Sequence, residues 1–465
     1  MTLHPKAGDV VTDVEGRAYK LGEVIGRGGQ GMVFREANNR LAIKIYTGKD
    51  PAAQAEFQQR FQAMAYRKTL PDSLVKPEAV LAPPYIGYVM PLIKKHTALK
   101  ELSYYDGSQG LDEWYNGLTG GLRRRLVLGA KIARAFSDIQ YSGLAYCDIS
   151  PNNVLISKET NKSTICLIDC DNLTIPGAAK YMAIGTPWYI APELLVGSHL
   201  ADSLSDGYSL AVLLFQLLTL EHPLMGDAVK EGPPELEKKA LLGEYPYIAH
   251  PTDTGNQLST GLPLDIVLSK RLQQLFTRAF VDGLRDRTKR PTPGEWEEAL
   301  WMASYMTCRC PRCNSTQYAV TVSMKECPWC DYAFESSAIA LFQSGLIVEG
   351  EKGSEWKATD TVGALCLDYE MNYVPYRLCV PGASGEWGDK TAAVIHRVRD
   401  SEEFILENVS DLELRVLGGK GWQRLTKGKN VPVAPGNRVL FPAPGEGQHM
   451  TRRLARIHKS QFGAG

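Results

Sequence analysis

The stretch Gly26-Arg27-Gly28-Gly29-Gln30-Gly31-Met32-Val33 is followed, a short distance downstream, by Ala42-Ile43-Lys44. Residues 19–46 alternate apolar and polar side chains between glycines, as antiparallel strands do. Glycines in such a hairpin let backbone amides approach a phosphate group without side-chain interference. Lys44 stands on the next predicted strand, where its ammonium can reach the same group. These two motifs together predict a nucleotide phosphate site rather than an ordinary glycine-rich hairpin with a solvated lysine.

A second group of polar residues lies far downstream. Asp148-Ile149-Ser150-Pro151-Asn152-Asn153 holds an aspartate and an asparagine five positions apart, and Asp169 ends the apolar run 165–168. Carboxylate and amide oxygens bind Mg²⁺, and an aspartate can orient a hydroxyl and accept its proton. Asp169 alone could be a turn residue after a strand. With Asn153 upstream, a simple turn residue is disfavoured.

The order and spacing of these motifs, together with Ala191-Pro192-Glu193, resemble those of a eukaryotic-like (Hanks-type) serine/threonine protein kinase of bacteria. The resemblance implies an α+β, bilobal protein kinase domain at 16–302, with a small lobe at 16–90 and a large lobe at 94–302. It implies transfer of the γ-phosphoryl group of Mg-ATP to a hydroxyl of a protein substrate. The segment 185–193 matches the end of the activation loop in Ser/Thr kinases, which disfavours a small-molecule kinase on the same fold.

The resemblance also assigns roles to individual residues. Asp148 is expected to orient the acceptor hydroxyl, and Lys44 to bind the phosphates. Asn153 and Asp169 are expected to hold magnesium. Glu56, on a helix predicted over 50–67, is expected to be the carboxylate partner of Lys44. The expected ATP-binding residues are Gly26, Gly28, Gly31, Val33, Ala42, Lys44, Met90, Leu92 and Leu155.

The sequence departs from the pattern of the family in three places. The usual His-Arg before the catalytic aspartate is Tyr146-Cys147, and Asp169-Cys170-Asp171 replaces Asp-Phe-Gly, so that Asp171 offers a second oxygen ligand. Ser150 stands where a lysine usually neutralises the transferring phosphoryl group. Losing that cation removes on the order of 2–4 kcal/mol of transition-state stabilisation if nothing replaces it. A competing hypothesis is therefore a pseudokinase scaffold that binds ATP but transfers little phosphate.

Further residues are expected to support the large lobe. Glu193 should pair with Arg290, and Asp206 should anchor the backbone of the catalytic loop. Thr186 should contact the catalytic aspartate as a hydrogen-bond donor, with a phosphorylation site as the alternative. The clearest predicted helices cover 123–141, 205–220 and 272–280, and a buried strand is predicted at 87–90.

Composition sets the outer limits. A chain of 465 residues is long enough for two or three domains. Lys plus Arg and Asp plus Glu both number 52, so no overall charge points to nucleic acid, and the longest apolar run, 210–218, is too short to span a bilayer. We expect a soluble, cytoplasmic protein that contacts neither nucleic acid nor a membrane. In that reducing compartment the ten cysteines are expected as ligands, core residues or free thiols rather than disulfides.

A separate cysteine pattern follows at 306–334. Cys310-Pro311-Arg312-Cys313 and Cys327-Pro328-Trp329-Cys330 are separated by thirteen residues. Two such knuckles present four thiolates that a tetrahedral Zn²⁺ can gather. A redox-active pair is the alternative, although such pairs normally occur singly beside a βαβ unit. The segment resembles a zinc ribbon, a module that usually serves for docking or for nucleic-acid contact. The few charges between its first and last cysteine favour docking.

From 340 to 465 the chain becomes β-rich. Strands are predicted at 362–367, 373–380, 392–398, 404–409, 412–417 and 438–441, and the basic tail 452–459 is expected to be a solvated terminal segment. We expect a sandwich or barrel that serves as an interaction domain. The whole arrangement is similar to kinases linked to stress and tellurite resistance, which implies a phosphatase and an adhesion-type domain protein as partners.

Overall fold

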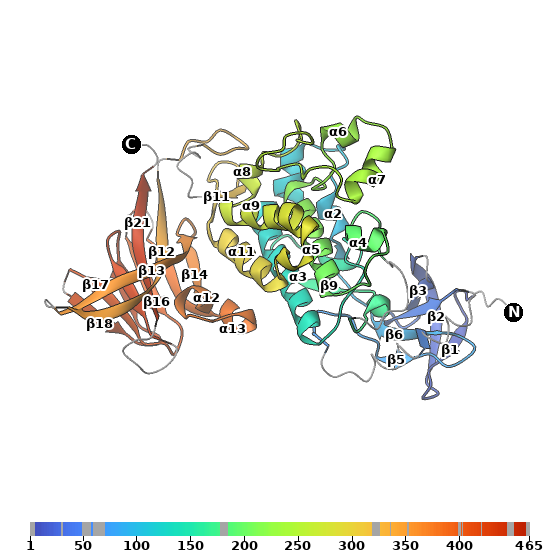
Figure 1. Ribbon diagram of the computed structural model, residues 1–465. Coiled ribbons are helices and arrows are strands. Elements are labelled where there is room, and N and C mark those ends of the chain that lie inside the picture. The colour runs from blue at the N-terminus through green and yellow to red at the C-terminus, as the bar shows by residue number, and fades with distance from the viewer. Residues whose placement is uncertain are drawn as a thin grey trace. The chain divides into compact units, whose positions relative to one another are not determined.

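The computed structural model describes residues 5–28, 31–48, 57–58, 70–176, 185–318, 326–334, 336–350, 353–398, 401, 403–419, 421–443 and 451–461. The chain divides into two compact units. The first comprises Met1–Tyr105, Leu128–Gly261 and Gln273–Glu297, and the second comprises Asp106–Val127, Leu262–Leu272 and Glu298–Gly465. Figure 1 labels their elements.

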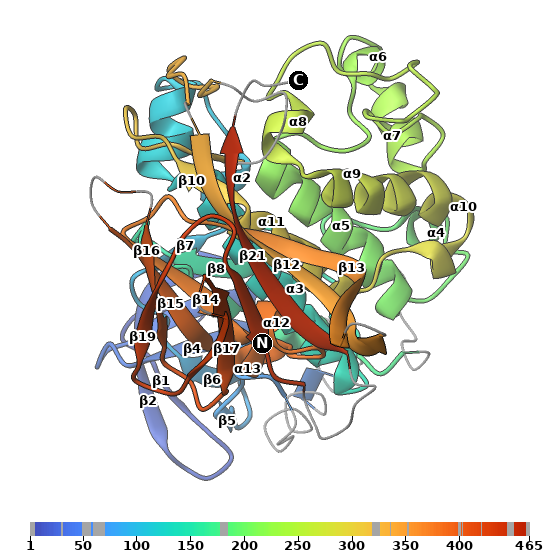
Figure 2. The same cartoon turned by 90° about the vertical axis from the view of Figure 1, so that its left-hand side faces the viewer.

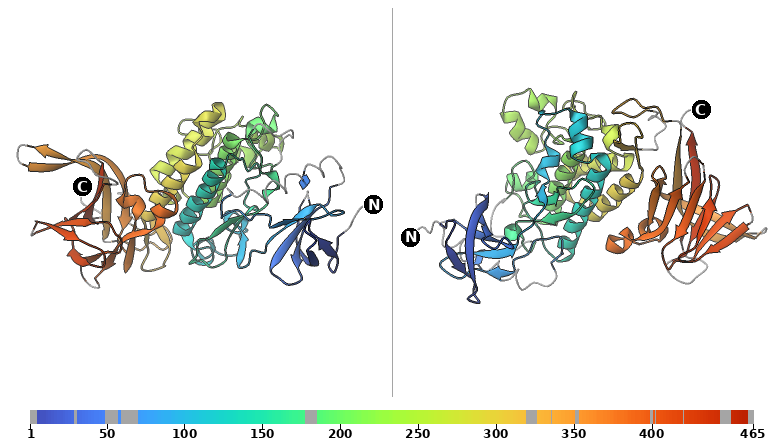
Figure 3. Two further views of the ribbon diagram at one scale, coloured as in Figure 1. Left: turned by 90° about the horizontal axis from the view of Figure 1, so that it is seen from below. Right: turned by 180° about the vertical axis from the view of Figure 1, so that it is seen from behind.

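The first unit begins with an antiparallel sheet, drawn in blue in Figure 3. In the described part of the chain its strand order is β1-β2-β3-β4-β6-β5. The strands are β1 (Val10–Thr12), β2 (Ala18–Arg27), β3 (Gly31–Glu36), β4 (Leu41–Tyr46), β5 (Ala79–Val80) and β6 (Gly87–Pro91). Alternation places Tyr19, Leu21, Phe34, Ile43 and Val89 in one hydrophobic cluster. The strands predicted at 19–46 and 87–90 are present. The predicted helix over 50–67, with Glu56, lies outside the described residues except for Phe57 and Gln58.

The helical part of the first unit is organised around α5 (Ser203–Thr219). Asp202 and Ser205 form a capping box at its start, and nearly all of its residues are buried. A helix that is apolar on all sides belongs in the centre of a lobe. The rings of Phe215, Phe276 and Phe280 pack against one another in edge-on and stacked pairs. The helices predicted at 205–220 and 272–280 are present, the second as a helix that ends at Thr277 and continues as the turn 278–282.

Other elements complete this unit. A three-stranded sheet of the described residues has the order β7-β8-β9. These strands and the surrounding helices are β7 (His96–Ala98), β8 (Val154–Ser157), β9 (Ile165–Leu167), α2 (Lys100–Ser103), α4 (Pro192–Leu195), α6 (Asp227–Lys230), α7 (Glu235–Leu241), α10 (Gly283–Arg285) and the short helical turns η2 (Cys170–Asn172), η3 (Arg278–Asp282) and η4 (Arg287–Lys289). Three helices have residues in both units: α3 (Gly121–Tyr141), α9 (Lys270–Thr277) and α11 (Pro293–Tyr305).

The second unit contains two sheets that share one core. Among the described residues the strand orders are β13-β12-β21-β20-β17-β18 and β14-β15-β16-β19. Phe342, Phe441 and Ile457 of the first sheet and Ile395 and Leu406 of the second lie in the same buried cluster. The strands are β12 (Ser336–Gly350), β13 (Gly353–Cys366), β14 (Met371–Pro375), β15 (Thr391–Arg397), β16 (Phe404–Asn408), β17 (Leu414–Gly418), β18 (Gly421–Leu425), β19 (Asn430–Val433), β20 (Arg438–Phe441) and β21 (Arg452–Gln461).

The second unit also holds short elements outside these sheets. The strands β10 (Thr307–Arg309) and β11 (Thr316–Tyr318) form an antiparallel hairpin. The remaining helical segments are η1 (Glu113–Leu118), α8 (Leu264–Val267), α12 (Tyr376–Cys379) and α13 (Gly385–Asp389). Within the described residues no helix is both long and apolar enough to cross a membrane.

Two predictions for the C-terminal region are wrong. The basic tail is not a solvated segment, because 452–461 form β21, which lies between β12 and β20 (red in Figure 2). Between and after its arginines, Leu454 and Ala455 are 2% and 3% exposed, and Ile457 lies in the core. The strand predicted at 373–380 ends at Pro375, and the helix α12 follows. Proline has no backbone N–H to donate to a strand ladder, which favours this strand end.

Candidate functional site

The predicted phosphate-binding hairpin is formed by β2 and β3 in the first unit. Gly26 pairs with Val33, and Val33 pairs in turn with Lys44 on β4. Gly31 is required by a close approach, because a Cβ there would lie 2.4 Å from the carbonyl oxygen of Ile45. By contrast, a Cβ added to Gly28 would meet no atom within 4 Å. The hairpin therefore leaves open space at Gly28.

The other expected ATP-binding residues lie on neighbouring strands. Ala42 is paired with Met90 across β4 and β6. Leu92 follows β6 and donates its N–H to the carbonyl oxygen of Arg40 at 3.2 Å. Leu155 lies on β8, opposite Cys166 of β9. The hairpin, β4 and β6 belong to one sheet, whereas Leu155 comes from a different sheet of the same unit.

Lys44 is nearly buried and contacts two carboxylates. Its Nζ lies 2.6 Å from Oδ1 of Asp169 and 2.5 Å from Oδ2 of Asp171. Burial by itself lowers the pKa of Lys44, but Asp171 and Asp169 raise it above its ordinary value. The ammonium is therefore held in the charged form at neutral pH.

Asp169 and Asp171 differ in their surroundings. The side chain of Asp169 is 30% exposed, whereas that of Asp171 is only 2% exposed. Oδ1 of Asp171 accepts a hydrogen bond of 2.9 Å from the hydroxyl of Tyr88 on β6. Burial raises the pKa of Asp171 to about 6, against the lowering effect of Lys44. Asp169 is thus the carboxylate that solvent and a metal ion can reach.

Asp148 is fixed by two neighbours. Asn153 Nδ2 donates to its Oδ2 at 3.0 Å, and the N–H and hydroxyl of Thr186 donate to its Oδ1 at 3.0 and 3.2 Å. Thr186 thus acts as the hydrogen-bond donor expected from its sequence context. Burial raises the pKa of Asp148, although these hydrogen bonds oppose the shift.

The backbone of the loop before Asp148 is anchored from α5. The carboxylate of Asp206 accepts hydrogen bonds from the N–H groups of Tyr146 at 2.6 Å and Cys147 at 2.9 Å. Cys147 has a φ of 70°, in the left-handed region. The Tyr146 hydroxyl donates to the carbonyl oxygen of Ile168, which precedes Asp169. This set links the loop of Asp148 to the loop of Asp169 and agrees with the role predicted for Asp206.

Glu193 and Arg290 form the expected ion pair. Nη1 and Nη2 of Arg290 lie 2.6 and 2.8 Å from the two carboxylate oxygens of Glu193. Their side chains are 2% and 10% exposed, respectively. Arg290 also donates to the carbonyl oxygens of Gly283 and Leu204, each at 3.0 Å. The pair therefore ties α4, the start of α5 and the segment before α11 together.

The sequence model of the family described as "Protein kinase domain" matches residues 19–302, well over half of the chain. This chain belongs to the protein kinase family. The match covers every residue of the site described above, from Gly26 to Arg290.

Bacterial serine/threonine kinases are among the proteins similar to this kinase domain. A probable serine/threonine-protein kinase of Streptomyces coelicolor is 28% identical over 230 residues, which cover 46% of this chain and 32% of that protein. The kinase PknA of Mycobacterium tuberculosis is 29% identical over 256 residues, or 50% of this chain and 55% of PknA. PknB of Mycolicibacterium smegmatis is 29% identical over 225 residues, or 45% and 34%. The chain matches between about a third and about half the length of these relatives.

One contact of the kinase site was not predicted from the sequence. The sequence offers Asp171 as a second oxygen ligand for the metal; in the structure it contacts Lys44 and Tyr88. Tyr88 was not singled out, although its place directly opposite Lys44 on the paired strand could have revealed it. Ser150, at the position of the missing lysine, is 1% exposed, and its Oγ has no hydrogen-bond partner among the described residues.

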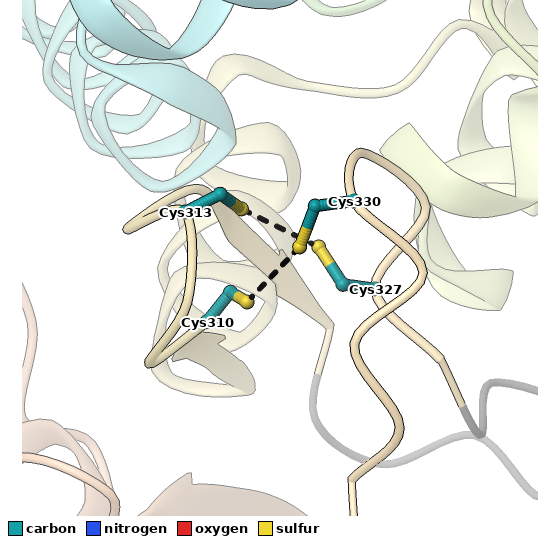
Figure 4. Close-up of side chains that lie close together, drawn as sticks. All are labelled: Cys310, Cys313, Cys327 and Cys330. Carbon is teal, nitrogen blue, oxygen red and sulfur yellow. Dashed lines mark hydrogen bonds between the residues drawn. The ribbon is translucent and has the colours of Figure 1, made fainter.

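The second unit holds the four predicted cysteines in one cluster (Figure 4). Their sulfur atoms all lie within 4.8 Å of one another, with separations of 3.7 Å for Cys310–Cys330 and 3.6 Å for Cys313–Cys327. Four sulfurs around Zn²⁺ at about 2.3 Å would be about 3.8 Å apart, whereas a disulfide would require about 2.05 Å. The geometry fits a tetrahedral metal site.

The two cysteine knuckles have matching backbones. The N–H of Asn314 donates to the carbonyl oxygen of Cys310, and the N–H of Asp331 donates to that of Cys327, both at 2.9 Å. Asn314 and Asp331 have φ values of 61° and 56°, a conformation that Asn and Asp adopt more readily than other side chains. Each knuckle is thus a tight turn that directs two thiols to one point.

The cluster is packed on helical residues of the same unit. The ring of Trp329, inside the second knuckle, stacks on Tyr115 of η1 with ring centroids 5.3 Å apart. The guanidinium of the buried Arg125 lies 3.9 Å from the centroid of Tyr115. Thr316 of β11 accepts a hydrogen bond of 3.1 Å from the N–H of Arg123. The knuckles are therefore part of a packed unit.

Proposed function

We propose that this chain is a serine/threonine protein kinase that transfers the γ-phosphoryl group of Mg-ATP to a hydroxyl of a protein substrate. The observation that carries the proposal is the convergence, in one unit, of Lys44, the Asp148–Asn153 pair and Asp169, which come from three separate segments of the sequence. The similarity to bacterial Ser/Thr kinases supports the same activity. The match of the family to 19–302 supports a kinase domain at 16–302.

Each residue has a distinct role in this proposal. Lys44 binds the phosphates of ATP with those of its three N–H donors that do not bond to its carboxylate partners. Asp169 and the amide oxygen of Asn153 hold Mg²⁺, since Nδ2 of Asn153 is already engaged with Asp148. Mg²⁺ neutralises charge on the phosphoryl oxygens when bound. Asp148 orients the acceptor hydroxyl and accepts its proton.

Phosphate incorporation from labelled ATP tests the proposal. Wild-type protein, Asp148→Asn and Asp169→Ala are each incubated with Mg²⁺, alone and with a generic Ser/Thr substrate. Glu159→Gln, which removes an exposed carboxylate elsewhere in the same unit, is the matched control. We expect labelling in the wild type and the control and none in the two site variants. Equal labelling in all four proteins, or none in a wild type that binds ATP, would refute the proposed activity.

We further propose that the segment 306–334 is a zinc ribbon in which Cys310, Cys313, Cys327 and Cys330 hold one Zn²⁺. The sulfur separations and the paired turns support this assignment. The packing of Trp329 on Tyr115 supports a structural role for the metal. A segment of this size depends on its metal for folding.

The β-rich segment 340–465 is proposed to be an interaction domain. This proposal is supported by the packed core that the two sheets share, because such a core gives the segment a stable surface. By resemblance to stress-linked bacterial kinases, a phosphatase and an adhesion-type domain protein are proposed as partners. Pull-down of such a pair by wild-type protein, and loss of capture after deletion of 340–465 in a folded remainder, would support the assignment.

A further inference from the structure

The ammonium of Lys44 has to stay in place while its neighbour Asp169 binds a metal ion. In the structure Lys44 Nζ contacts Asp169 at 2.6 Å and Asp171 at 2.5 Å. A Mg²⁺ ion held by Asp169 would share the charge of that carboxylate and would thereby weaken the attraction of Asp169 for Lys44. A second carboxylate that does not bind the metal would keep the lysine in position.

Asp171 has the surroundings that this task requires. Its side chain is 2% exposed, against 30% for Asp169, so it is shielded from a metal ion in solution. One of its oxygens contacts Lys44, and the other accepts the hydrogen bond of 2.9 Å from Tyr88. Both carboxylate oxygens are therefore engaged by protein groups.

Tyr88 is well placed to fix Asp171. It is directly opposite Lys44 in the antiparallel pairing of β6 with β4, and side chains at such positions project from the same face of the sheet. Tyr88 is fully buried, and burial raises the pKa of its hydroxyl well above the ordinary value. The hydroxyl thus remains a hydrogen-bond donor across the working pH range.

We propose that Asp171, held by Tyr88, is the positioning residue that keeps Lys44 aligned with the ATP phosphates. The inference rests on the proposed function, because it assigns Lys44 to ATP. Asp171 acts through Lys44 and does not touch the nucleotide or the metal. The Asp-Cys-Asp sequence that departs from the kinase pattern thereby adds a lysine partner on the same loop as the metal-binding aspartate.

Binding of ATP in EDTA, measured by calorimetry, isolates this role from metal binding and from phosphoryl transfer. Asp171→Asn is expected to weaken metal-free ATP binding about tenfold, the effect of losing one hydrogen bond to a charged group. Tyr88→Phe retains the carboxyl group of Asp171 and is expected to weaken binding about 2- to 10-fold. Removing a negative charge near an anionic ligand would by itself tighten binding, so weaker binding identifies positioning.

Lys44→Met provides the second comparison. In that background neither Asp171→Asn nor Tyr88→Phe should weaken ATP binding further, because the lysine through which both act is absent. Glu159→Gln serves as the neutralisation control, and a thermal melt of each variant checks that it is folded. If Asp171→Asn does not fold, Tyr88→Phe alone decides the question.

The outcomes separate the alternatives. The positioning role is supported if Asp171→Asn and Tyr88→Phe weaken metal-free ATP binding and if neither change has this effect in the Lys44→Met background. Unchanged or tighter metal-free binding overturns it, and a raised Mg²⁺ requirement with unchanged metal-free affinity would make Asp171 a metal ligand instead. Because the assay needs no phosphoryl transfer, a chain that fails to label any substrate would disprove the proposed kinase activity and still give a result here.

Discussion

Replacing Glu193 by glutamine should destabilise the first unit strongly. The change removes the carboxylate that faces Arg290 at 2.6 and 2.8 Å and leaves a guanidinium that is 2% exposed without a counter-ion. Breaking a buried ion pair by removing one partner costs about 3–5 kcal/mol. Arg287, whose Nε lies 3.1 Å from Glu193, loses a contact as well.

The reverse change, Arg290→Met, should cost at least as much. It leaves Glu193 with Arg287 alone and removes the donors to the carbonyl oxygens of Gly283 and Leu204. The buried carbonyl of Gly283, left without this donor, adds about 1–3 kcal/mol. In the double variant the charges disappear together, so its destabilisation should be smaller than the sum of the two single changes by about 2 kcal/mol or more.

Thermal and urea unfolding of the full chain would measure these differences. A loss of 3–5 kcal/mol corresponds to a fall in melting temperature on the order of 10 °C. Glu159→Gln is the control, since its pair with Lys162 is exposed and screened by solvent and should add little to stability. If Glu193→Gln shifts the midpoint no more than this control, or if the two single changes are additive in the double variant, the buried pair does not support the lobe as reasoned.

Other outcomes follow from the same structure. Burial tends to raise the pKa of Glu193, but Arg290 lowers it below its ordinary value of 4.5. The stability difference between the wild type and Glu193→Gln should therefore be largest above pH 4.5 and should shrink as the pH falls through the lowered pKa. A difference that grows on acidification would contradict the pairing. Metal analysis should find one Zn²⁺ per chain, and chelation or Cys327→Ser should lower the unfolding temperature, whereas equal stability with and without metal would exclude a structural site. Ser150→Lys should raise kcat by about 30- to 1000-fold if the cation of the family is missing, while an unchanged kcat would indicate that another group already supplies it.

Motifs that combine fixed spacing with specific chemistry were readable from the sequence. The glycine hairpin, Lys44, Asp148 with Asn153, and the paired cysteine knuckles all depend on local backbone geometry, so their residues stand at short, constrained separations. The structure brings Lys44 together with Asp169 and Asp148 together with Asn153. The apolar run of α5 was likewise visible, because a helix buried on all sides needs apolar residues throughout.

Contacts between distant segments were decided by the tertiary structure. Tyr88 donates a hydrogen bond to Asp171, which is 83 positions away in the sequence, and the spacing of the two residues does not predict this contact. The basic tail forms the strand β21 because its backbone pairs with β12 on one side and with β20 on the other. Its apolar side chains are buried in the core. The ring of Trp329 likewise stacks on Tyr115, which lies far upstream in the sequence. The sequence by itself determined which local pieces form and which chemistry they carry, since those follow from neighbouring residues. Only folding decided which pieces meet, because strand pairing and burial depend on surfaces assembled from the whole chain.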